Sequence, residues 1–81
     1  MNMEDHVINV MSEVLDVSCL DIDVDDYLEY DLKLDSLEIV ELQIALEIEF
    51  EVRFDDEEFE MLDTVQEVID YTVLYCECER V

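Results

Sequence analysis

The sequence contains no glycine and no proline, and only 3 of its 81 residues are lysine or arginine. The missing glycines exclude the glycine-rich phosphate loop, the type I′ hairpin turn, the regular EF-hand loop and the G-x-S-x-G nucleophile elbow. The scarcity of positive charge, against 26 aspartates and glutamates, excludes direct binding to nucleic-acid backbones or anionic membrane surfaces. Partners of this chain should instead present basic patches.

Membrane segments and disulfide bonds are also not expected. No apolar run approaches the roughly 18 residues of a membrane span, and no signal peptide is recognisable. The three cysteines, Cys19, Cys76 and Cys78, do not form a disulfide framework. These features are typical of a reduced protein of the cytoplasm or an organelle matrix, and we predict the cytoplasm.

Apolar residues are abundant, at 52% of the chain, which is enough for the core of one small domain spanning residues 1–81. The formal charge of −23 must then form a shell over a packed interior. Mutual repulsion within that shell lowers stability, and salt or divalent cations should return part of it. The same repulsion opposes self-association, so we expect a monomer.

Apolar residues recur at helical spacing in several segments. We predict helices over residues 2–16, 36–50, 56–61 and 64–76, with an acidic loop over residues 17–34. The predicted fold is all-α, a small four-helix bundle with three longer helices and a short third helix.

Polar residues that cap helices precede these segments. Asn2 is the predicted N-cap of the first helix. Asp35 followed three residues later by Glu38 resembles a capping box. Thr64 followed by Glu67 repeats that pattern before the last helix.

The second predicted helix carries two apolar stripes. One stripe, which we name the docking stripe, consists of Leu37, Val40, Ile44 and Ile48. The other consists of Ile39, Leu42, Leu46 and Phe50. The second stripe starts two residues after the first. Because each residue turns the helix by about 100°, this offset places the two stripes on roughly opposite sides of the helix. A helix at the edge of a small bundle buries only one side well, so we expect the other to face a partner. The alternative is a central helix covered all round.

Acidic residues help to choose between the stripes. Glu41, Glu47 and Glu51 border the docking stripe and give it a negative rim. Such a surface attracts basic partners electrostatically and binds them through a modest apolar patch. We therefore predict that the docking stripe is the exposed one.

The stretch DLKLDSLEIVELQIALEIEF, followed by DDEEFEMLDTVQEVIDYT, resembles the acyl carrier proteins. The hallmarks of that family are D-S-L at the start of the second helix, V-E-L one turn later, and a closing segment of the form T-V-x-x-hydrophobic-I/V-D-Y. The resemblance extends from the first amphipathic segment to Tyr71. It implies a four-helix bundle with a short third helix. The chain departs from many family members at Lys33, where glycine is common, and at Asp55, where proline is frequent.

The resemblance implies that Ser36 is a tether rather than a catalytic residue. In the family this serine receives 4′-phosphopantetheine from coenzyme A, and the thiol of that arm carries acyl groups as thioesters. The modifying transferase, with its own metal, supplies the chemistry, so the chain itself is predicted to be non-catalytic. Recognition by the transferase and other partners is assigned to Asp35, Leu37, Glu38, Val40, Glu41, Ile44, Glu47 and Ile48.

The resemblance also implies an acyl pocket and a set of partners. Bound acyl chains fold back into the bundle in the fatty-acid members, and burial stabilises them by about 0.8 kcal/mol per methylene. The predicted pocket residues are Ile39, Leu42, Leu46, Met61 and Leu62. The predicted partners are a phosphopantetheinyl transferase, or holo synthase, and acyl-transferring enzymes of fatty-acid or polyketide synthesis that present basic docking patches.

Several alternatives stay open at this stage. A discrete carrier of type II fatty acid biosynthesis is the leading prediction, with a polyketide or other specialised acyl carrier as the alternative. An acidic protein that mimics nucleic acid would explain the charge but not the family motifs. Asp21, Asp23 and Asp25 begin like an EF-hand, yet Asp26 replaces its glycine and Leu32 its bidentate glutamate. Cys76 and Cys78 lack a second ligand pair, so no metal site is predicted.

Overall fold

The computed structural model describes residues 2–78, except for the side chains of residues 77 and 78. Its helices are α1 (Met3–Leu15), α2 (Ser36–Phe50), α3 (Asp56–Glu60) and α4 (Val65–Cys78), with a 3₁₀ turn η1 (Cys19–Asp21) in the acidic loop. The predicted all-α architecture with a short third helix is confirmed. The limits of α2 match those predicted, and the other helices begin and end within two residues of theirs.

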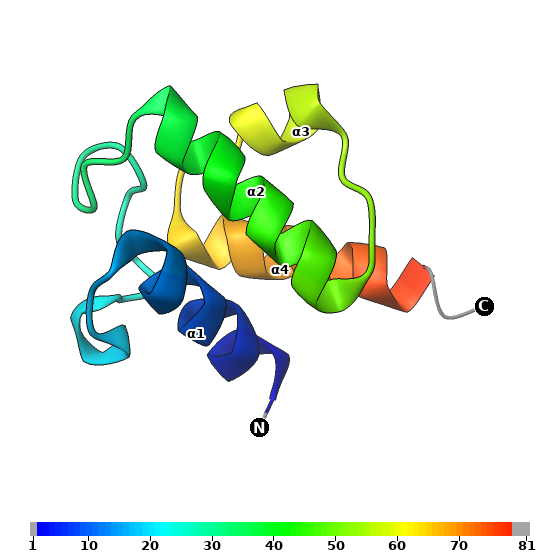
Figure 1. Ribbon diagram of the computed structural model, residues 1–81, viewed down its shortest axis with the longest axis horizontal. Coiled ribbons are helices and arrows are strands. Elements are labelled where there is room, and N and C mark those ends of the chain that lie inside the picture. Colours follow the sequence, from blue (N-terminus) through cyan, green and yellow to red (C-terminus); the bar gives the residue numbers. More distant parts are fainter. Residues whose placement is uncertain (1, 79–81) are drawn as a thin grey trace.

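The helices surround one apolar interior. α1 packs against both α2 and α4, and α1 and α3 lie on opposite sides of α2 in the view of Figure 1. Every helix contributes at least one side chain to the interior, and the acidic loop contributes Ile22, Leu28 and Leu34. The largest fully buried apolar side chains are Phe59, Met11, Leu28, Leu42, Leu46, Val7, Val65 and Val68.

The predicted caps are present at the helix starts. The Asn2 side chain accepts a 2.8 Å hydrogen bond from the backbone of Asp5. Thr64 and Glu67 exchange hydrogen bonds of 3.2 Å between the side chain of each and the backbone N–H of the other. These contacts satisfy N–H groups that have no partner within a helix, which explains why short polar residues precede each segment.

Among residues 2–78, three residues have left-handed backbone conformations although none of them is glycine. Asp16 and Glu51 end α1 and α2 with φ of 55° each, and Lys33 has φ of 57°. Such positions usually carry glycine, because a Cβ atom is disfavoured there by roughly 1–2 kcal/mol. The conformation of Lys33 is one that glycine would adopt with less strain.

Side-chain hydrogen bonds attach α3 to its neighbours. Gln43, a buried residue of α2, donates through Nε2 to Oδ1 of Asp56 at 2.5 Å. On the other side, the Tyr71 hydroxyl of α4 donates to Oε1 of Glu58 at 2.8 Å. Phe59 is fully buried. A helix of five residues is too short to be stable alone, so these contacts hold it in place.

Aromatic rings surround the ring of Tyr71. The ring of Phe54 lies 5.2 Å from that of Tyr71 and 5.3 Å from that of Tyr75, measured between centroids. Burial raises the pKa of the Tyr71 hydroxyl far above its ordinary value, and the hydrogen bonds with Tyr75 and Glu58 raise this pKa further. Tyr71 therefore stays protonated and serves as a hydrogen-bond donor.

The acidic loop is fixed against the start of α4 by backbone hydrogen bonds. Leu28 donates to the carbonyl of Asp63 at 2.8 Å, and Val65 donates to the carbonyl of Asp26 at 3.0 Å. An isolated bridge pairs Tyr27 with Thr64. Although the loop has no regular structure beyond the turn η1, these long-range contacts determine its path over the bundle.

Candidate functional site

Ser36 is the first residue of α2, and its side chain is exposed. The preceding residue, Asp35, is the N-cap: its Oδ1 accepts a 2.8 Å hydrogen bond from the backbone of Glu38. The Glu38 carboxylate accepts in return from the Asp35 backbone at 3.3 Å, which completes the predicted capping box. Since both carboxylates bond to backbone groups, the helix start is well defined and the serine hydroxyl stands at its tip.

No histidine lies beside Ser36. The single histidine of the chain, His6, pairs through Nε2 with Oε2 of Glu49 at 2.8 Å. Glu49 is thirteen residues further along the chain, near the opposite end of α2, so about 20 Å of helix separates it from Ser36. A Ser36–His6 catalytic pair is therefore excluded by geometry.

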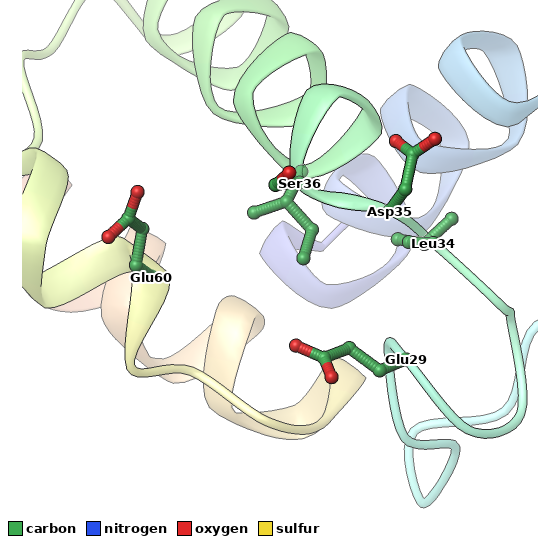
Figure 2. Close-up of a pocket in the computed structure, with 6 residues that line it drawn as sticks. Glu29, Leu34, Asp35, Ser36 and Glu60 are labelled. Atoms are coloured by element: carbon green, nitrogen blue, oxygen red, sulfur yellow. The ribbon is translucent and has the colours of Figure 1, made fainter.

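An open pocket of about 480 Å³ adjoins Ser36. Leu34 and Ile39 are its buried apolar residues, and Glu29 and Glu60 are exposed residues at its edge. Figure 2 shows that Glu29 comes from the acidic loop and Glu60 from α3, on different sides of the space next to Ser36. The pocket thus combines an apolar floor with an acidic border at the only serine of α2.

One of the two apolar stripes of α2 is buried and the other is exposed. Leu42 and Leu46 are fully buried, Ile39 is buried and Phe50 is half-buried. The docking stripe is exposed, with Leu37 at 64%, Val40 at 39%, Ile44 at 49% and Ile48 at 72%. The prediction that this stripe faces outward is confirmed, and the alternative of a helix covered all round is wrong. The docking stripe therefore stays the predicted contact surface for partners.

Residues 5–72 match the family model described as the phosphopantetheine attachment site. The chain belongs to this family of carrier proteins. Its fold matches the solved structure of "a putative acyl carrier protein" from Mycobacterium tuberculosis with a TM-score of 0.80 and 25% sequence identity, over 91% of this chain and 99% of that one. The resemblance to acyl carrier proteins is therefore confirmed. A domain of this family is a site of covalent 4′-phosphopantetheine attachment, and carrier proteins interact with transferases and synthesis enzymes.

The predicted acyl-pocket residues of the carrier protein lie in different surroundings. Ile39 lines the pocket beside Ser36. Leu42 and Leu46 are in the central core, and Leu62 is half-buried. Met61, also a predicted pocket residue, is the C-cap of α3 and is 77% exposed. The roles of these residues toward an acyl chain stay predictions.

Sequence reasoning missed Leu34, Glu29 and Glu60 as residues of the pocket. Leu34 could have been identified from the sequence, because it is an apolar residue two positions before the serine. The two glutamates could not, because acidic residues occur throughout the carrier protein. Their position depends on how the loop and α3 fold back toward Ser36, which no local pattern specifies.

The acids at the rim of the docking stripe differ in their availability to a partner. Glu41 is exposed, and its carboxylate makes no hydrogen bond or ion pair with the rest of residues 2–78. Glu47 is half-buried, and its Oε2 accepts a 2.8 Å hydrogen bond from the backbone of Phe54. Glu51 occupies the left-handed position that ends α2. Of the three, Glu41 is the residue that can be replaced without disturbing a side-chain hydrogen bond or a left-handed backbone position.

The alternative sites suggested by the sequence are not assembled among the described residues. In the acidic loop, Asp23 Oδ1 accepts from the backbone of Asp25 at 3.0 Å, and Asp26 Oδ2 accepts from the backbone of Asp23 at 3.0 Å. No group of three or more potential metal ligands occurs in this part of the carrier protein. The side chain of Cys78 lies outside the described residues. Within the described range, no helix has the length and hydropathy needed to cross a bilayer.

Proposed function

We propose that Ser36 carries the 4′-phosphopantetheine arm and that this carrier protein presents acyl thioesters to the separate enzymes of cytoplasmic type II fatty acid biosynthesis. The observation that supports Ser36 most directly is its exposed position at the tip of α2, next to the pocket of about 480 Å³. An attachment residue has to reach the active site of the transferase, and an exposed helix start allows that approach.

The local electrostatics also suit a phosphodiester at this serine. A negatively charged group at a helix N-terminus is stabilised by roughly 0.3–1 kcal/mol, because unpaired N–H groups and the helix dipole favour it. The neighbouring acids oppose this effect, but a covalent link persists regardless of that balance. Ser36 itself needs no activating base, because the transferase supplies the catalytic groups. The carrier protein is accordingly proposed to be non-catalytic.

Delivery to many enzymes is supported by the docking stripe. Its four aliphatic side chains form a small exposed row, and Glu41 adds an exposed negative charge that attracts a basic partner. Screened surface charges change the association rate more than the affinity. Such a surface suits repeated, short encounters with different enzymes, as a discrete carrier requires.

Attachment is tested by mass spectrometry after incubation with coenzyme A, Mg²⁺ and a broad-specificity phosphopantetheinyl transferase. The wild-type protein should gain one arm, and Ser36→Ala should gain none. Ser18→Ala is the matched control, since Ser18 is also an exposed serine at a helical start, and it should be modified like the wild type. The assignment of Ser36 is contradicted if the Ser36→Ala protein gains the arm, or if only the Ser18→Ala protein fails to gain it.

The pathway is tested separately with the modified protein. Purified acyl-loading and condensing enzymes of fatty-acid synthesis are compared with those of polyketide synthesis at equal concentrations. Faster loading and elongation by the fatty-acid enzymes is the expected result. Preferential loading by the polyketide set would reject the fatty-acid pathway and favour the specialised carrier, while leaving the attachment at Ser36 intact.

A further inference from the structure

A second pocket, distinct from the docking stripe, opens between the acidic loop and the start of α4. It has a volume of about 220 Å³ and is lined by Tyr27, Glu29, Tyr30 and Asp63. The two tyrosine rings lie 6.0 Å apart at an angle of 77°, edge to face. Both are exposed, Tyr30 to 80%. Two large aromatic rings held in solvent are not explained by core packing.

The walls of this pocket are fixed by the backbone. Tyr27 forms the bridge with Thr64, and Leu28 donates to the Asp63 carbonyl at 2.8 Å. The loop is also closed on itself, because the Tyr27 backbone donates to Oδ2 of Asp31 at 2.8 Å. The side that carries Tyr27 and Tyr30 is therefore attached to the side that carries Asp63. A ligand would meet a preformed backbone, and its binding would have to order only the exposed side chains.

The chemistry of the lining favours a cation. Neither the Glu29 nor the Asp63 carboxylate makes a hydrogen bond or ion pair with other groups in the part of the chain that the structure describes. Aromatic faces attract cations within about 6 Å of the ring centroid, and carboxylates pair with them directly. The volume is below the roughly 300–1,000 Å³ of small-molecule pockets, which favours a single side chain over a whole metabolite.

Arginine fits this lining better than lysine. Its planar guanidinium stacks on an aromatic face and also donates several hydrogen bonds in a fixed plane, whereas an ammonium is a compact and strongly hydrated charge. A tyrosine pair with two carboxylates offers both a face to stack on and acceptors at its edge. Partners of a protein with a net charge of −23 must in any case present basic residues.

We propose that the pocket of Tyr27, Glu29, Tyr30 and Asp63 receives an arginine side chain of the transferase that modifies Ser36. Glu29 lines both this pocket and the pocket beside Ser36, so an arginine bound here anchors the enzyme next to the serine. The arginine site is a second contact, additional to the docking stripe. The identity of the partner rests on the proposed attachment at Ser36, but the binding of a guanidinium does not.

The pocket is tested first by NMR titration of the ¹⁵N-labelled protein with N-acetyl-arginine amide. N-acetyl-citrulline amide is the neutral control of the same shape. Arginine should shift the backbone signals of residues 27–30 and 63, and citrulline should not. Tyr30→Ala should weaken binding by roughly two- to fivefold, because one cation–π contact is lost.

A matched pair of charge variants separates the pocket from general attraction to an acidic surface. Glu29→Gln with Asp63→Asn removes two charges from the pocket, and Glu13→Gln with Glu57→Gln removes two exposed charges elsewhere. The first pair should abolish the local shifts and the second should preserve them. Shifts spread evenly over the acidic surface, or equal losses in both pairs, overturn the proposal of an arginine pocket.

Steady-state kinetics of the cognate transferase test the partner. Tyr30→Ala and Asp63→Asn should raise the KM for the carrier protein roughly two- to fivefold with kcat unchanged, and Glu57→Gln should leave both constants unchanged. Equal KM values in all variants overturn the transferase as the partner. If the wild-type protein is not modified at all, the attachment at Ser36 fails instead, and the arginine titration still decides the pocket.

Discussion

Asp35 and Glu38 bond to each other's backbone at the start of α2, with hydrogen bonds of 2.8 Å to the Asp35 carboxylate and 3.3 Å to the Glu38 carboxylate. Asp35 is thus a structural cap in addition to being a predicted recognition residue for the transferase. A substitution that removes both the charge and the cap cannot separate these two properties, so a test of recognition has to keep the cap.

Two substitutions of Asp35 separate these properties. Asp35→Asn removes the charge but keeps a good N-cap, so the free energy of unfolding should change little while modification of Ser36 slows. Asp35→Ala removes both and should also lose about 0.5–2 kcal/mol of stability. Urea unfolding and the rate of arm attachment are the measurements. An Asp35→Asn protein that is modified as fast as the wild type would show that Asp35 acts only as a cap.

The two faces of α2 should respond differently to truncation. Leu46→Ala creates a cavity in the core and should cost about 2–5 kcal/mol, a large part of the stability of a small domain. Ile48→Ala on the exposed docking stripe should stay within about 0.5 kcal/mol of the wild type. Acyl loading by partner enzymes should nevertheless slow in Ile48→Ala. Unchanged loading would remove Ile48 from the proposed docking surface.

Charge reversal at the rim is best made at Glu41. Glu41→Lys should slow association with a basic partner at low salt, and the difference from wild type should shrink as ionic strength rises. Glu57→Lys, an equal charge change at an exposed position of α3, is the control. Stopped-flow association rates provide the measurement. Glu47 is unsuitable because its carboxylate holds the Phe54 backbone. Equal slowing in both variants would indicate attraction by net charge alone.

The left-handed residues predict a route to higher stability. Lys33→Gly and Glu51→Gly relieve a disfavoured backbone conformation while adding flexibility to the unfolded chain, so the net gain should be up to about 1 kcal/mol each. Glu13→Gly, inside α1, should instead lose about 1 kcal/mol. Thermal and urea unfolding measure all three. Destabilisation by Lys33→Gly would show that the lysine side chain makes a compensating contribution.

Tyr71 predicts a loss of stability in alkali. Its folded-state pKa is raised above the ordinary value of 10.0, mainly by burial. Below pH 10 both states keep the proton, and above it only the folded state does, so the free energy of unfolding falls as the pH rises through 10. This decline should be shallower in Tyr71→Phe, measured by urea unfolding between pH 8 and pH 11. Equal slopes would show that Tyr71 ionises alike in both states.

Most of α2 could be predicted from the sequence alone. Its limits follow from the Asp35–Glu38 pattern and from the spacing of Leu42 and Leu46, which are local signals of capping and amphipathicity. The exposure of Ile48 followed from having two stripes on a helix that can bury only one. These features depend on residues within one or two turns of each other.

The surroundings of Ser36 were not predictable in the same way. Glu29 reaches the pocket because the acidic loop pairs with the start of α4, through contacts such as Leu28 with Asp63, more than thirty residues apart. Uniform acidity hides such a residue, since one glutamate in the loop resembles another. The exposure of Met61 was not predictable for a related reason: whether a residue after a five-residue helix points inward depends on where that helix is held.

The pairing of His6 with Glu49, and the 4.5 Å contact of its ring with Phe50, makes the imidazole a built-in spectroscopic reporter. Because the chain has one histidine, its ring protons give a signal free of overlap from any other imidazole. That signal originates at the end of α2 remote from Ser36. Comparing this signal before and after thioester loading shows whether an attached acyl group affects α2 along its whole length or only at the end that carries Ser36.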